Sequence, residues 1–211
     1  MMEVIASAGA IGMHEDEVTA VILAGGEGRR MGGRDKGWES FAGEPLITHV
    51  VNRLAPQVGC IAINANRSLE RYRALGYPLI SDRETGYHGP LMGMWSALCA
   101  VETPWALFVP CDSPVLPADL VTRLQDGIGA QRIAVAHDGH RAHPVVALID
   151  TALRDDLGAA LRDGERKIDR WYARHPWCHV DFSDQPEAFA NLNSPDDRDV
   201  MERRWRSDES F

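Results

Sequence analysis

Apolar residues in this chain gather into two alternating kinds of segment. Short uninterrupted apolar runs, of which Thr19 to Leu23 is the first, are typical of strands in a sheet covered on both faces. Apolar residues three or four positions apart are typical of helices that lay one face on such a sheet. Strands are predicted at residues 19–23, 61–63, 105–109, 133–136, 144–149 and 179–182. Helices are predicted at residues 45–54, 68–75, 91–101, 117–124, 153–161 and 168–173, with a short one after Pro195.

Local signals mark two of the helix starts. Pro45 is expected in the first turn of its helix, where a missing N–H is harmless, and Ser68 is expected as an N-cap. Strands and helices alternate along the chain, which predicts a three-layer α/β/α fold with a mostly parallel sheet. Ligands of such sheets bind beyond the carboxyl ends of the strands. Polar residues that directly follow a strand are therefore candidate site residues.

No linker rich in proline, glycine or serine divides the 211 residues, and there is no internal repeat. A chain of this length is able to bury a single full core. We therefore expect one domain over residues 18–204, with a flexible leader at residues 1–17 and a flexible tail at residues 205–211.

Composition narrows the class of function. The formal net charge of −9 argues against nucleic-acid binding, which needs a basic face. No apolar run approaches the roughly 18 residues that span a bilayer, so no membrane partner is expected. The first 17 residues lack the basic start and apolar core of a signal peptide. The four cysteines form no CxxC pair and no dense disulfide pattern, which favours reduced thiols and a cytoplasmic location.

The loop after Leu23 is rich in glycine and carries Arg29, Arg30, Arg34 and Lys36. Such a loop brings backbone N–H groups and cations onto a polyphosphate. It is not a dinucleotide fingerprint, because Met31 stands where that motif needs glycine, and it lacks the Gly-Lys-Ser/Thr of a P-loop. The remaining pattern is L-A-G-G-x-G-R-R-M-G-G-x-D-K.

This pattern resembles the N-terminal signature of the sugar- and cofactor-nucleotidyltransferases. The run Arg30-Met31-Gly32-Gly33 with Asp35-Lys36 is most similar to the molybdenum cofactor guanylyltransferases, and the resemblance extends over residues 18–197. It implies a Rossmann-like nucleotidyltransferase fold and a site made of residues that match the family's motifs. For GTP these are Leu23, Ala24, Gly25, Gly26, Lys36, Asn64, Asp82 and Asp112. For the pterin of the second substrate they are Gly33, Gly89, Gly93, Asn191 and Asn193.

The resemblance also implies the catalytic residues, which are Lys36, Asp112 and Arg30. An apolar strand ends at Pro110 and delivers Asp112 to the edge of the sheet. Mg²⁺ prefers hard oxygens and is typically held by one or two carboxylates plus substrate phosphates. The family's P-C-D-x-P motif matches residues 110–114, so the resemblance implies Asp112 as the metal ligand. The neighbouring Cys111 has no paired base in the sequence and is interpreted as a packing residue.

Two further features of the sequence bear on the site. His137, His140 and His143 lie at three-residue spacing, but a closed zinc site needs a fourth ligand. A hairpin near the site, or a substrate contact, is favoured instead, and His140 departs from the family's pattern. Lys167 stands where the family has a second arginine, which weakens a bidentate phosphate contact.

The resemblance implies transfer of GMP from GTP to molybdopterin, with pyrophosphate as the second product. Its implied partners are GTP, molybdopterin, other proteins that make the molybdenum cofactor, and the apo-molybdoenzymes that receive it. Three alternatives stay open from the residues: a cytidylyl version of the reaction, a sugar-phosphate nucleotidyltransferase, and a carrier that binds nucleotide or pterin without catalysis.

Overall fold

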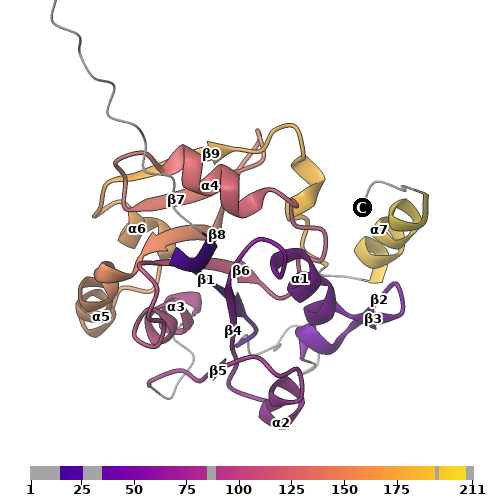
Figure 1. Ribbon diagram of the computed structural model, residues 1–211, viewed down its shortest axis with the longest axis horizontal. Coiled ribbons are helices and arrows are strands. Elements are labelled where there is room, and N and C mark those ends of the chain that lie inside the picture. Colours follow the sequence, from indigo (N-terminus) through magenta and orange to yellow (C-terminus); the bar gives the residue numbers. More distant parts are fainter. Residues whose placement is uncertain (1–14, 26–34, 85–88, 193–194, 208–211) are drawn as a thin grey trace, which may run out of the picture.

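A computed structural model describes residues 15–25, 35–84, 89–192 and 195–207 of the chain. Its centre is a seven-stranded sheet in the order β5-β4-β1-β6-β8-β7-β9 (Figure 1). The strands are β1 (Val18–Leu23), β4 (Cys60–Asn64), β5 (Leu79–Ile80), β6 (Trp105–Pro110), β7 (Ile133–His137), β8 (Ala142–Asp150) and β9 (Trp177–Asp181). Every pair in the sheet is parallel except the two that β8 makes. The predicted α/β fold with a mostly parallel sheet is confirmed.

Helices cover both faces of this sheet (Figure 1). They are α1 (Leu46–Leu54), α2 (Leu69–Arg73), α3 (Pro90–Leu98), α4 (Leu120–Ile128), α5 (Arg154–Arg162) and α6 (Ile168–Tyr172). A further helix, α7 (Pro195–Ser207), packs instead against a separate small cluster that includes Phe41. Alternate residues of β1 point to opposite faces, as strand geometry requires. Ala20 and Ile22 join a buried cluster with α1, α2 and α4, whereas Val21 joins one with α3, α5 and α6. These two clusters form the core between the three layers. No helix among the described residues is long and apolar enough to cross a membrane.

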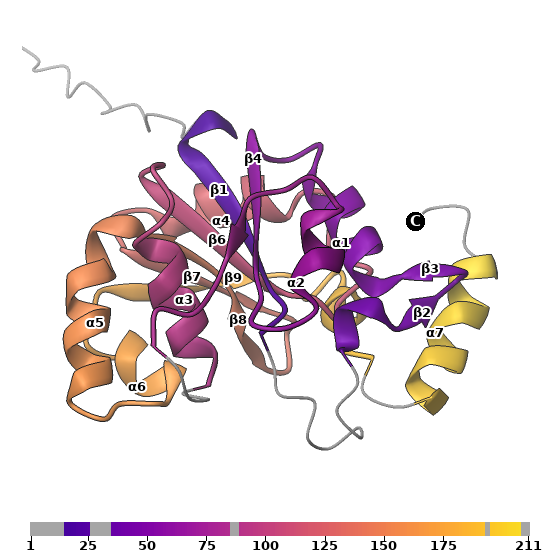
Figure 2. The same cartoon turned by 90° about the horizontal axis from the view of Figure 1, so that it is seen from below.

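The C-terminal helix α7 lies beside a small hairpin made of β2 (Ser40–Phe41) and β3 (Glu44–Pro45) (Figure 2). The ring of Trp205 packs edge-on against Phe41, with centroids 5.6 Å apart. The helix therefore continues beyond residue 204, where a flexible tail was expected to begin. It has thirteen residues, so the expectation of a short terminal helix is wrong.

Two expected helix starts differ in detail. Ser68 is the N-cap residue of α2, as predicted, but it has a left-handed backbone (φ 50°) and its side chain makes no cap hydrogen bond. Pro45 precedes α1 as an extended N-cap residue, because it pairs with Ser40 in the β2–β3 hairpin. The hairpin turns through Ala42 and Gly43, both with positive φ. Its two-residue strands are too short for a periodicity to reveal them.

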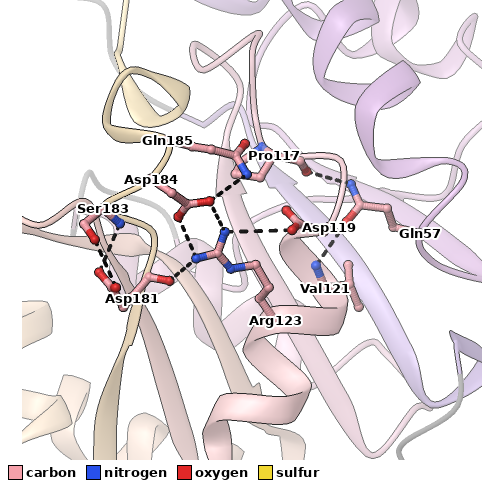
Figure 3. Close-up of polar contacts among 9 residues, drawn as sticks. All are labelled: Gln57, Pro117, Asp119, Val121, Arg123, Asp181, Ser183, Asp184 and Gln185. Atoms are coloured by element: carbon pink, nitrogen blue, oxygen red, sulfur yellow. Dashed lines mark hydrogen bonds and ion pairs between the residues drawn. The ribbon is translucent and has the colours of Figure 1, made fainter. Parts of the chain in front are cut away.

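A polar seam fixes the segment that follows β6 (Figure 3). The amide of Gln57 donates to the carbonyl of Pro117 at 3.0 Å and accepts from the N–H of Val121 at 3.0 Å, which ties the start of α4 to the chain after α1. On the other side of α4, the guanidinium of Arg123 donates twice to the carboxylate of Asp184, at 2.9 and 2.8 Å. The connection between β6 and α4 is thus held at its α4 end.

Candidate functional site

One edge of the sheet collects most of the predicted site residues. Leu23 of β1 is in register with Asn64 of β4 and with Pro110 of β6, and Asn64 is in register with Ile80 of β5. These residues are the carboxyl ends of four neighbouring parallel strands. Gly25, Asp82 and Asp112 follow these strand ends within two residues, so they meet at that edge.

At the centre of this edge, the ammonium group of Lys36 lies 2.6 Å from Oδ2 of Asp112. Lys36 opens a single 3-10 turn, η3 (Lys36–Trp38), and its side chain is 25% exposed. Asp112 is buried at the end of β6. The sequence hypothesis required these two charges on the same side of the sheet, close enough to share one triphosphate, and the structure brings them into direct contact.

The carboxylate of Asp112 suits a hard divalent cation. Its Oδ2 atom accepts a hydrogen bond from the Lys36 ammonium, whereas Oδ1 accepts no hydrogen bond from the described residues. A single carboxylate with a free oxygen, completed by substrate phosphates, is a usual Mg²⁺ donor set. Among the described residues there is no cluster of three or more His, Cys, Asp or Glu able to hold a metal without substrate.

The end of the edge at β4 and β5 is organised by the buried amide of Asn64. Its Nδ2 group donates to Oδ1 of Asp82 at 3.0 Å and to the carbonyl of Ile80 at 3.2 Å. The N–H of Asp82 in turn donates to the side-chain oxygen of Asn66 at 2.8 Å. The N–H of Ala24 donates to the Asn64 carbonyl at 2.8 Å, which brings Ala24 and Gly25 to the same place. This network fixes the direction of the Asp82 carboxylate.

Two glycines leave just enough space for the Asn64 side chain. A Cβ atom at Gly93 of α3 would lie 2.4 Å from Oδ1 of Asn64, and one at Gly25 would lie 3.2 Å from the same atom. Gly93 therefore has a packing reason for lacking a side chain, and its expected pterin contact stays a prediction. Gly89 is exposed at the N-cap of α3 with φ 74°, a backbone conformation that favours glycine.

The other end of the edge links Asp112 to the segment before α7. The buried hydroxyl of Ser113 donates to Oδ1 of Asn191 at 3.1 Å, and the N–H of Leu192 donates to the Asp112 carbonyl at 3.1 Å. A cavity of about 310 Å³ opens beside Asn191, between η5 (Pro186–Phe189) and α7, and includes Val200 and Met201 in its lining. Asn191 is thus tied directly to the turn that carries the expected metal ligand.

The three histidines around the turn between β7 and β8, which are His137, His140 and His143, do not come together at one point. His143 bonds Oδ2 of Asp138 through Nε2 at 2.7 Å, whereas the His137 ring packs against His179 with centroids 5.0 Å apart. Burial raises the pKa of Asp138, but hydrogen bonds from the amides of Arg141 and His140 and from His143 outweigh it and hold that pKa well below its usual range. Burial lowers the pKa of His143 against the opposing effect of Asp138. His143 is therefore a neutral, hydrogen-bonded ring at neutral pH.

Cys111 is buried beside Asp112. Burial raises the pKa of its thiol strongly, and the negative charges of Asp112 and Asp35 raise it further. A protonated thiol is a poor nucleophile. Cys111 accordingly packs among the apolar residues of the core cluster beneath α1 and α4.

Four predicted residues, Gly26, Arg30, Gly33 and Asn193, lie outside the described residues. Conversely, the structure adds three polar residues to which the sequence assigned no role: Asp35, Asn66 and Ser113. Each lies next to, or two residues from, a residue that a motif had indicated: Asp35 precedes Lys36, Asn66 lies two residues after Asn64, and Ser113 follows Asp112. That adjacency was the only signal in the sequence, because their partners are distant along the chain.

The chain is similar in sequence to known proteins. Residues 20–178 match the protein family described as the MobA-like NTP transferase domain. The molybdenum cofactor guanylyltransferase of Shewanella loihica is 50% identical over 187 residues, which cover 88% of this chain and 95% of that protein. That of Shewanella woodyi is 50% identical over 186 residues, which cover 87% and 95%.

Solved structures share the fold. The molybdopterin-guanine dinucleotide biosynthesis protein A of Archaeoglobus fulgidus superposes with a TM-score of 0.74 at 21% identity, over 90% of this chain and all of that one. A nucleotidyl transferase of Methanothermobacter thermautotrophicus superposes with a TM-score of 0.72 at 16% identity, over 91% and 99%.

Proposed function

This chain belongs to the MobA-like NTP transferase family, and we propose that it transfers GMP from GTP to molybdopterin, forming the guanine dinucleotide cofactor and pyrophosphate. Identity of 50% to molybdenum cofactor guanylyltransferases along nearly the whole chain supports this substrate pair. The observation that carries the chemistry is the contact between Lys36 and Asp112 at 2.6 Å, on the edge of the sheet where ligands of such folds bind.

GTP would lie along the carboxyl ends of β1, β4 and β6. Gly25 lacks a side chain and supplies a close approach for phosphates, and Ala24, whose N–H donates to the Asn64 carbonyl, holds Gly25 beside Asn64. Asp82 is held by Asn64 and Asn66, and its Oδ2 atom accepts no hydrogen bond from the described residues. A carboxylate oriented in this way accepts the N–H donors of a guanine edge, which adenine does not present.

The reaction joins a phosphate oxygen of the pterin to the α-phosphorus of GTP, and the bond from that phosphorus to the β-phosphate bridging oxygen breaks. A phosphate monoester has a second pKa of about 6, so the attacking group is already anionic near neutral pH and needs no general base. The site must instead align two mutually repelling phosphates and offset their charge. Lys36 supplies a cation at the centre of the site, and we assign Arg30 the same role.

Nucleotidyltransferases typically use a divalent metal, and we assign Mg²⁺ to that role with Asp112 as its protein ligand. When bound, the ion would offset negative charge on the phosphates. Asp112 would hold the ion through its carboxylate, and the Lys36 ammonium, which lies 2.6 Å from that carboxylate, would supply a second positive charge to the phosphates.

The second substrate would lie at the opposite end of the edge. Asn191 is anchored there by Ser113, next to the cavity beneath α7. We place the pterin near Asn191 and Asn193, with Gly89 and Gly33 as further contacts, and expect the product to pass to apo-molybdoenzymes. Consumption of GTP and four free thiols support a cytoplasmic location.

Pyrophosphate release from purified protein tests the proposal. The protein is incubated with Mg²⁺, molybdopterin and, in separate reactions, GTP, CTP, ATP or UTP. We expect release with GTP that depends on molybdopterin. Release with CTP but not with the other three nucleotides would indicate the cytidylyl reaction. Release only with a hexose phosphate as acceptor would indicate a sugar nucleotidyltransferase. GTP binding without any release of pyrophosphate would indicate a carrier.

A further inference from the structure

The turn that carries Lys36 rests on helix α2 through a buried phenol. Tyr72 is 0% exposed, and its hydroxyl donates to Oδ1 of Asp35 at 2.7 Å. Asp35 is the N-cap residue of the turn and directly precedes Lys36, but its side chain makes no cap hydrogen bond within the turn. The carboxylate of Asp35 is therefore used to attach the turn to α2 rather than to close the turn itself.

The turn fits closely against α2 in two further places. A Cβ atom at Gly37 would lie 2.5 Å from the Tyr72 hydroxyl, so residue 37 has no space for a side chain. The ring of Trp38 packs on the ring of Tyr72 with centroids 5.1 Å apart, and the guanidinium of Arg71 lies 4.1 Å from the Trp38 ring centroid. Residues 35–38 therefore meet α2 with little freedom to rotate.

The buried carboxylate of Asp35 lowers the stability of the fold. Its side chain is 9% exposed, and Oδ2 makes no hydrogen bond with the described residues, although Nε of Arg67 lies 3.9 Å away. A buried carboxylate with incomplete hydrogen bonding destabilises a protein relative to an apolar residue of similar size. Arg67 directly follows the segment from Asn64 to Asn66. Asp35 therefore connects the turn that carries Lys36 to the end of the site where we place the guanine base.

We propose that Asp35 and Tyr72 are positioning residues that hold Lys36 in the direction of Asp112 and of the substrate phosphates. This inference rests on the proposed nucleotidyl transfer and deepens it. The mechanism is geometric: the Tyr72 hydroxyl fixes Asp35, Asp35 fixes the backbone of the turn, and the turn aims the ammonium group. Neither residue needs to touch substrate.

Amine labelling tests the positioning without any substrate. The chain contains only two lysines, Lys36 and Lys167, so an N-hydroxysuccinimide ester reads out Lys36 against an internal reference by peptide mass spectrometry. In the wild-type protein we expect slow labelling of Lys36, because its ammonium is paired with Asp112. Tyr72→Phe is expected to raise the Lys36 rate severalfold and to leave the exposed Lys167 unchanged.

Tyr77→Phe is the matched control. It removes a phenol hydroxyl that makes no hydrogen bond among the described residues, and it is expected to leave both lysine rates unchanged. Asp35→Asn is the second variant. It keeps an acceptor for Tyr72 but removes the charge that faces Arg67, and it is expected to raise Lys36 labelling as well.

Steady-state kinetics supply the second measurement. Misalignment of a charged group typically slows the chemical step more than it weakens binding, so we expect Tyr72→Phe to lower kcat about ten- to hundredfold with little change in the KM for GTP. A folded Tyr72→Phe protein with wild-type Lys36 labelling and wild-type kcat overturns the inference. If the wild-type protein releases no pyrophosphate at all, the proposed function fails, and the labelling result still decides whether Tyr72 positions Lys36.

Discussion

The ammonium of Lys36 and the carboxylate of Asp112 lie 2.6 Å apart, although 76 residues separate them in the chain. One belongs to the turn after the glycine-rich loop and the other to the end of β6. Their contact places a positive and a negative group side by side, at the point where we propose that a triphosphate and a divalent cation bind.

Asp112→Asn should nearly abolish turnover. Loss of the carboxylate removes the proposed metal ligand, and removal of one preorganised electrostatic group typically lowers kcat by about 10²–10³. The folding penalty should be small, about 1 kcal/mol or less, because the paired Lys36 is partly exposed to solvent. Pyrophosphate release at saturating Mg²⁺ and urea unfolding provide the two measurements.

Asp119→Asn is the matched control for Asp112→Asn. Asp119 follows in the same connection, but its side chain is 52% exposed and it lies at the start of α4. We expect wild-type kcat in this control. Full activity of Asp112→Asn at saturating Mg²⁺ would rule out the metal-ligand assignment.

Gly93→Ala should weaken the binding of GTP. The added methyl group would lie 2.4 Å from Oδ1 of Asn64, so the Asn64 side chain must move away from Asp82. We expect a raised KM for GTP, with a smaller change in the KM for molybdopterin. Isothermal titration with GTP measures the same effect without turnover.

Gly158→Ala is the control for Gly93→Ala, because it also adds a methyl group to a tightly packed glycine but does so away from Asn64. Its methyl group would lie 2.7 Å from Nε1 of Trp95, between α5 and α3 and away from Asn64. This variant should lower the unfolding temperature without changing the KM for GTP. Equal GTP affinity in Gly93→Ala and wild-type protein would show that Asn64 has no part in nucleotide binding.

The sequence predicted the sheet and the edge that carries the site because both depend on local patterns. Apolar runs locate β1, β4 and β6, and parallel pairing then places the residues that follow them side by side. Asn64, Asp82 and Asp112 were found in this way, with a family resemblance to suggest their roles. The confirmed α/β fold therefore needed little tertiary information.

The contacts that hold those residues were not predictable. Tyr72 and Asp35 are 37 residues apart, and Ser113 and Asn191 are 78 apart. No periodicity links such pairs, because each depends on how α2 or the segment before α7 packs onto the finished sheet. Tyr72 looks like an ordinary core residue of a short helix until its hydroxyl is seen to bond Asp35.

Ser113→Ala should raise the KM for molybdopterin with little effect on the KM for GTP. The Ser113 hydroxyl donates to Oδ1 of Asn191 and so fixes the orientation of that amide, whose Nδ2 group is a donor. Without the hydroxyl, the amide is free to flip and to present its oxygen to an anionic substrate. Ser113→Thr keeps the hydroxyl and should restore much of the affinity. Equal KM values for molybdopterin in all three proteins would exclude an orienting role.

The Asp138–His143 pair should make the fold sensitive to mild acid. Burial lowers the pKa of His143 below its ordinary value of 6.5, so the unfolded chain binds this proton more readily than the folded protein. Stability should accordingly fall as the pH drops below about 6.5. Hydrogen bonds from the Arg141 and His140 amides and from His143 lower the pKa of Asp138 despite its burial, so its contribution persists above 3.8 and is lost only at lower pH.

His143→Gln tests the first of these two ranges, because it removes the titrating ring but keeps a donor for Asp138. Urea unfolding at pH 7, 6 and 5 should show a shallower loss of stability in this variant than in the wild-type protein. His140→Gln, at an exposed position of the same hairpin, controls for the loss of an imidazole and should follow the wild-type curve. Parallel curves for His143→Gln and wild type would mean that the ring accepts a proton as easily in the folded state as in the unfolded chain. The stack of His143 on Phe189, with centroids 4.8 Å apart, would then have to tolerate the charged ring without loss.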